Sequence, residues 1–120
     1  MKCILLLPIL MALVAAETYS TENDDLDIEA VVGDLNLLKS FLDCFNDKKP
    51  CDDVQADFKK DLPEAFQNAC HKCTAAQKHI FKRFIEESEK KVVDDLNALK
   101  KKYDPESKHY AALLAAISKS

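Results

Sequence analysis

The side chains with the most definite chemistry in this sequence are four cysteines, spaced Cys44-x6-Cys51-x18-Cys70-x2-Cys73. Thiols at such spacings can form disulfides, hold a zinc ion or exchange a disulfide with a substrate. Paired zinc ligands are usually two to four residues apart, so the six residues between Cys44 and Cys51 disfavour a zinc site. A redox role for Cys70 and Cys73 would favour a βαβ context. We therefore expect structural cysteines, with no metal ligand among them.

The first sixteen residues predict a cleaved secretory signal peptide. Lys2 is followed by an almost wholly apolar run that ends in Val14-Ala15-Ala16, the small-residue pattern before a cleavage site. The run is too short to cross a hydrocarbon core about 30 Å thick. Cleavage removes the fifth cysteine, Cys3, and leaves residues 17–120 as one secreted, extracellular domain.

Four cysteines in a short secreted chain favour two disulfides, for which three pairings exist. Cys44 and Cys51 flank a turn at Pro50, and Cys70 and Cys73 are three residues apart. Each of these pairs can bring its Cα atoms within the ~4.4–6.8 Å that a bridge needs. The spacing therefore favours the local bridges Cys44–Cys51 and Cys70–Cys73.

The other reactive side chains predict no catalytic site. His71, His79 and His109 lie far apart in the sequence, and no Ser/His/Asp or Cys/His arrangement follows from their spacing. The chain carries 17 basic and 21 acidic residues, a net charge of −4 that disfavours nucleic acid and anionic membranes as partners. We expect a non-enzymatic protein with no cofactor, no nucleic-acid partner and no membrane insertion.

The elements that position the cysteines are predicted to be helices. The chain has one glycine, Gly33, whereas a compact β fold needs more of them at its turns. Apolar residues recur with helical spacing in six stripes, within residues 28–32, 38–45, 54–69, 80–85, 92–103 and 110–117. The sequence thus predicts an all-α fold of about six short amphipathic helices.

Local signals mark where these helices begin. The predicted N-caps are Asp34, Asp52 or Asp53, Thr74 (in a capping box with Gln77) and Ser107. Pro63 interrupts the third stripe, but the stripe continues in phase, so we expect one kinked helix there. The polar segment 17–25 is expected to be loose.

The cysteine spacing and several motifs around it resemble the insect chemosensory-protein family, the four-cysteine, olfactory-segment-D-like soluble carriers. The resemblance covers nearly all of residues 17–120. The matching motifs are Tyr19-Ser20-Thr21, Asp24-Asp25-Leu26-Asp27, Leu37-Leu38, Asp43-Cys44, Leu62-Pro63-Glu64-Ala65, Cys70-His71-Lys72-Cys73-Thr74, Gln77 and Tyr103-Asp104-Pro105. Leu96 stands where the family usually has a tryptophan, and we expect it to be buried.

The resemblance implies a superhelical arrangement of helices around an apolar channel, with both bridges local. It implies a carrier that binds small hydrophobic ligands, such as long-chain fatty acids, alcohols, esters or semiochemicals. The inward faces supply the candidate lining residues, which are Ile28, Leu38, Phe41, Leu42, Leu62, Phe66, Ile80, Phe84, Leu96 and Tyr103. We expect a monomer whose partner is a small apolar or amphiphilic ligand.

Two other interpretations stay open at this point. A secreted helical interaction protein, with a developmental or immune role, would have a filled interior and an exposed apolar patch. A thiol oxidoreductase would present an exposed, reducible pair at Cys70 and Cys73.

Overall fold

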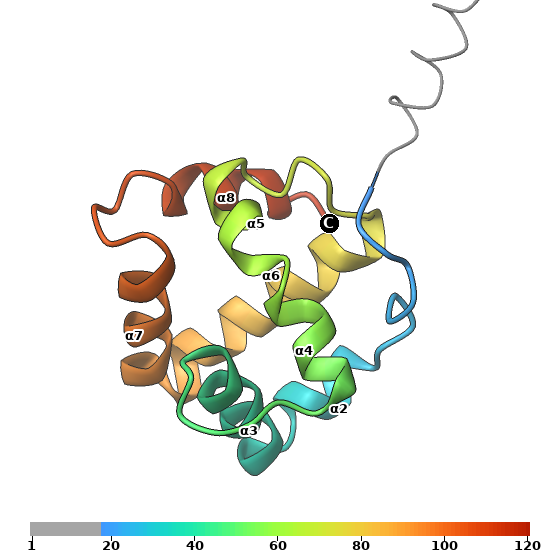
Figure 1. Cartoon of the computed structure of the whole chain (residues 1–120), viewed down its shortest axis with the longest axis vertical. Coiled ribbons are helices and arrows are strands. Elements are labelled where there is room, and N and C mark those ends of the chain that lie inside the picture. The colour runs from blue at the N-terminus through green and yellow to red at the C-terminus, as the bar shows by residue number, and fades with distance from the viewer. Residues whose placement is uncertain (1–17) are drawn as a thin grey trace, which may run out of the picture.

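Helices make up all the regular structure in residues 18–120, the part of the chain that the computed structural model describes (Figure 1). They are α2 (Ile28–Val32), α3 (Leu35–Phe45), α4 (Asp53–Lys59), α5 (Leu62–Gln67), α6 (Ala75–Lys91), α7 (Val93–Tyr103) and α8 (Tyr110–Ile117). The prediction of an all-α fold with about six helices is confirmed, with α4 and α5 as two halves of one predicted segment. The predicted signal peptide lies outside the described residues.

The expectation of one kinked helix around Pro63 is wrong, because the chain forms two helices there. Lys60 ends α4, and Asp61 begins α5 as its N-cap. Pro63 then falls in the first turn of α5, where the N–H that proline lacks has no helical partner in any case. The apolar stripe stays in phase across the break, so Leu62 and Phe66 are both buried.

Most of the predicted N-caps are confirmed. The Asp34 carboxylate accepts from the Leu37 N–H at 3.2 Å, and Asp52 caps α4. The capping box at α6 is complete: Thr74 Oγ1 accepts from the Gln77 N–H at 3.1 Å, and Gln77 Oε1 accepts from the Thr74 N–H at 2.9 Å. These ends are specified locally, which is why the sequence reveals them.

The predicted cap at Ser107 is wrong, and an earlier carboxylate takes its place. Asp104 is buried, and its two oxygens accept from the N–H groups of Lys108, His109 and Tyr110 at 2.9, 3.0 and 2.9 Å. Ser107 has a φ of 55° and makes no cap. One side chain thus satisfies three backbone donors where the chain enters α8.

The longest helix, α6, is the centre of the arrangement. It packs against α2, α7 and α8, while α3 packs against α2, α4 and α7. In Figure 1, α4 and α5 cross in front of α6, and α7 lies to one side. None of the helices in residues 18–120 combines the length and the apolar character needed to cross a bilayer.

Both local disulfides are present. Cys44 and Cys51 have Cα atoms 5.1 Å apart and join the end of α3 to the chain before α4. Cys70 and Cys73, with Cα atoms 5.0 Å apart, close the turn between α5 and α6. The pairing favoured by the sequence is therefore confirmed.

Candidate functional site

An apolar pocket lies between α2, α3, α5 and α6 and holds a cavity of about 60 Å³. Nearly all of its wall is hydrocarbon. The residues that line it are Tyr19, Leu26, Ile28, Phe41, Phe45, Phe58, Asp61, Leu62, Ala65, Cys73, Gln77, Ile80, Phe81 and Phe84. A wall of this kind suits an apolar guest, which it would hold by removing hydrocarbon surface from water.

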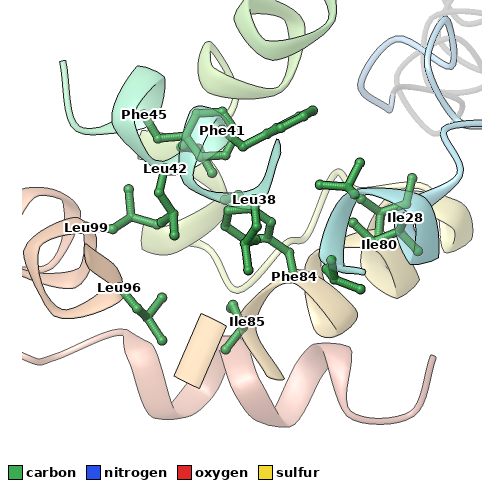
Figure 2. Packing of buried hydrophobic residues seen from close by; sticks show 14 of the residues in the cluster. Ile28, Leu38, Phe41, Leu42, Phe45, Ile80, Phe84, Ile85, Leu96 and Leu99 are labelled. Atoms are coloured by element: carbon green, nitrogen blue, oxygen red, sulfur yellow. The ribbon is translucent and has the colours of Figure 1, made fainter. Parts of the chain in front are cut away.

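Three phenylalanines form one side of the pocket. The rings of Phe41 and Phe45, one turn apart on α3, meet edge to face with centroids 6.0 Å apart. Phe84 of α6 lies 5.6 Å from Phe45 and 6.4 Å from Phe41. Figure 2 shows these side chains projecting from α3 and α6, with Ile80 on the same helix as Phe84. The cluster packs α3 against α6 and forms an aromatic wall of the pocket.

The segment before α2 closes another side of the pocket. The Tyr19 N–H donates to the Lys72 carbonyl at 3.0 Å, and Gln77 Nε2 donates to the Ser20 carbonyl at 2.8 Å. Asn23 Nδ2 donates to the Asp57 carboxylate at 2.8 Å. The expectation of a loose segment is therefore wrong for residues 18–25, because long-range hydrogen bonds fix it against α4 and the start of α6.

The polar rim of the pocket lies where this segment meets α5. The Tyr19 hydroxyl donates to Glu64 Oε1 at 2.8 Å, and this bond lowers the pKa of Glu64. Burial, with help from the same contact, raises the pKa of Tyr19. Asp61 also faces this rim, and burial raises the pKa of its carboxyl group. The rim is therefore acidic, in contrast to the apolar interior.

Five of the ten candidate lining residues lie on the pocket wall: Ile28, Phe41, Leu62, Ile80 and Phe84. Four of the other five, Leu38, Leu42, Phe66 and Leu96, are buried in the packed core beside it, whereas Tyr103 is half-buried and lines a separate, more polar cavity at the loop between α7 and α8. Leu38 and Leu42 are fully buried on the neighbouring face of α3, and Leu96 is buried on α7. Phe66 stacks on Tyr103 with centroids 5.7 Å apart. The burial expected of Leu96 is confirmed.

Nine wall residues were not among the candidates. Phe45, Phe58, Ala65 and Phe81 belong to the stripes that the periodicity identified, so a wider selection would have included them. Tyr19 and Leu26 interrupt a polar segment as isolated large apolar residues, a signal that was available. Asp61, Cys73 and Gln77 carry no such signal, because only the tertiary arrangement brings them to the pocket.

Neither a redox disulfide nor a metal site is supported within residues 18–120. Cys70 is fully buried and Cys73 half-buried, and their bridge closes a turn between two helices and not the βαβ unit typical of a redox CxxC pair. No group of three potential metal ligands occurs within residues 18–120. A second cavity of about 190 Å³ lies at the α7–α8 loop, but it is more polar, and the Asp104 carboxylate on its wall is already occupied by backbone donors.

Comparison with known proteins gives consistent matches. The family described as "Insect pheromone-binding family, A10/OS-D" matches residues 19–111. Allergen Tha p 1 of Thaumetopoea pityocampa is 35% identical over 91 residues, which cover 76% of this chain and 72% of that protein. Ejaculatory bulb-specific protein 3 of Drosophila melanogaster is 31% identical over 121 aligned residues, covering 97% of this chain and 96% of the relative.

A solved structure has the same fold. It is a chemosensory protein in complex with bromo-dodecanol, and it superposes with a TM-score of 0.74 at 23% sequence identity. The match covers 86% of this chain and 100% of the other. The helical arrangement described above is therefore that of a chemosensory protein.

Proposed function

The chain belongs to the insect pheromone-binding family A10/OS-D, and on that premise we propose that it is a secreted, non-enzymatic carrier of small hydrophobic ligands. The observation that carries this proposal is the apolar pocket between α2, α3, α5 and α6. Its wall offers hydrocarbon and aromatic surface but no arrangement of nucleophile, base and electrophile. Such a site can take a ligand out of water and release it unchanged.

The ligands we propose are long-chain molecules with one polar end. Each buried CH2 contributes up to ~0.8 kcal/mol, and association costs at least ~4 kcal/mol in lost freedom. Chains of about twelve or more carbons therefore reach useful affinity, at micromolar dissociation constants or weaker. Bromo-dodecanol, held by the structurally similar chemosensory protein, is a molecule of this kind.

Binding such a chain requires the pocket to widen. Its cavity of about 60 Å³ is smaller than the ~150 Å³ that admits benzene in an engineered apolar cavity. Drug-sized ligands generally occupy ~300 Å³ or more. Rotation of wall side chains such as Phe41 and Phe84, with outward movement of residues 18–27, would supply the space. The observed pocket then corresponds to the closed form of the carrier.

A chain-length series tests this function. The protein has no tryptophan, so displacement of an apolar fluorescent probe is the appropriate readout. Linear alcohols from eight to sixteen carbons should displace the probe with affinity that rises up to about fourfold per CH2 and then levels off when the pocket is full. No displacement below about a millimolar at any length would contradict the proposal.

A matched pair of substitutions locates the binding. Ala65→Leu adds hydrocarbon to the buried pocket wall, whereas Ala111→Leu makes the same change at an exposed position of α8. We expect Ala65→Leu to weaken binding of the longest alcohols at least fivefold and Ala111→Leu to leave it unchanged. Equal effects of the two would place the ligand elsewhere.

A further inference from the structure

The pocket wall carries three side chains with nitrogen or oxygen atoms, and two of them are already satisfied. The Tyr19 hydroxyl donates to Glu64 at 2.8 Å. The Gln77 amide accepts from the Thr74 N–H and donates to the Ser20 carbonyl, at 2.9 and 2.8 Å. The third, Asp61, has two acceptor oxygens, and its partner among residues 18–120 is the Lys60 ammonium at 3.6 Å. Asp61 thus has acceptor capacity to spare at the edge of an apolar site.

The backbone explains why this carboxylate does not cap α5. Asp61 occupies the N-cap position of α5, where aspartate usually accepts from the backbone of the first turn. Here its φ and ψ are −92° and −13°, a helical conformation, and its side chain makes no capping bond. The side chain is 21% exposed, so it is turned largely toward the protein.

The charges around Asp61 leave an excess of negative charge at the rim. Burial is the main cause that raises the pKa of Asp61, and Lys60 acts to lower it. The like charges of Asp57 on α4 and Glu64 on α5 add smaller effects that raise the same pKa. Lys60 is mostly exposed and is shared with the Asp57 carboxylate, while Lys72 pairs with Glu64 at 3.5 Å. Three carboxylates therefore face two ammonium groups.

We propose that Asp61 selects the headgroup of the ligand, so that the pocket takes hydroxyl-terminated chains in preference to fatty-acid carboxylates. This inference rests on the proposed carrier function and specifies its ligand class. A ligand hydroxyl can donate to the Asp61 carboxylate in a charge-assisted hydrogen bond. A ligand carboxylate cannot donate, and it would bring a like charge into a partly desolvated rim.

Dodecanol and dodecanoate test the inference because they have the same number of carbons. Displacement titrations would be run at pH 8, where both carboxylates are charged, and below the concentration at which dodecanoate forms micelles. The wild-type protein should bind dodecanol at least about tenfold more tightly than dodecanoate. Asp61→Asn should reduce this ratio to about threefold or less, mainly by strengthening dodecanoate binding.

Control variants separate a local effect from a change in net charge or folding. Asp94→Asn removes an equal charge from an exposed position of α7 outside the pocket wall, and it should preserve the wild-type ratio. Asp61→Ser should reproduce the effect of Asp61→Asn, since the native side chain caps nothing. Equal wild-type affinities, or a ratio unchanged in both Asp61 variants, would overturn the inference and leave the carrier function standing. Failure of both ligands to displace the probe would overturn the carrier function itself.

Discussion

Neighbouring apolar residues on one helix have different roles in this protein. On α3, Leu38 and Leu42 are fully buried in the packed core, whereas Phe41 and Phe45 line the pocket. The two sets alternate along one stripe, which is wide enough to face both regions. The pocket wall and the packed core therefore draw on the same helix, and Figure 2 shows Leu38 and Phe41 both projecting from α3.

A substitution at Leu96 tests how strongly the core beside the pocket stabilises the fold. The Leu96 side chain is 1% exposed on α7, among other buried leucines. Leu96→Asp would bury a charge with no partner, and we expect the free energy of unfolding to fall by at least about 3 kcal/mol. Denaturant-induced unfolding, followed by circular dichroism, measures this change.

The same substitution at an exposed site of α7 provides the control. Val93 is 47% exposed in the first turn of the helix, where a negative charge is electrostatically favourable. Val93→Asp should leave stability within about 0.5 kcal/mol of wild type. If Leu96→Asp were equally harmless, the assignment of the inward face of α7 would be wrong.

At the scale of elements, α8 depends on a residue outside itself. Its first turn has no side-chain cap, and the Asp104 carboxylate instead binds the three N–H groups that precede and begin the helix. Asp104→Asn should lower Tm by several degrees, since an amide oxygen accepts more weakly and the NH2 group cannot accept at all. Glu106→Gln, an exposed change in the same loop, should leave Tm unchanged.

The contribution of Asp104 to the stability of the fold should depend on pH. Burial alone would raise the pKa of this carboxyl group, but the backbone donors outweigh burial and lower it. A lowered pKa in the folded state means that the stabilisation is present above the unfolded value of about 3.9 and is lost as pH falls through the folded value. The Tm difference between wild type and Asp104→Asn should therefore be full at pH 6 and shrink below pH 4. A difference that persists unchanged at pH 2 would contradict this account.

Elements specified by local chemistry could be predicted from the sequence, and those specified by distant contacts could not. The caps at Asp34 and Thr74 and both local disulfides depend on residues a few positions apart. The fixed conformation of residues 18–25 depends on groups far along the chain, such as the Lys72 carbonyl and the Gln77 side-chain amide. The same limit applies to the site, because one periodic stripe contains both wall and core residues, and Asp61 reaches the pocket only through the turn between α4 and α5.

At the scale of the whole molecule, the helices enclose a pocket that is narrow in its observed form. The alternative of a solid interaction protein would place binding on exposed apolar side chains, of which Leu35, Leu37 and Val93 are the largest among residues 18–120. The carrier account places it between α3 and α6, against Phe41 and Phe84. The two accounts thus assign contact with an apolar molecule to different residues.

Intermolecular nuclear Overhauser effects distinguish these accounts most directly. Isotope-labelled protein would be mixed with unlabelled dodecanol, and contacts from the alkyl chain to protein protons would be recorded. The carrier account predicts contacts to the rings of Phe41 and Phe84 and to the methyl groups of Ile80. Contacts confined to the methyl groups of Leu35, Leu37 and Val93, or no contacts at saturating dodecanol, would contradict it.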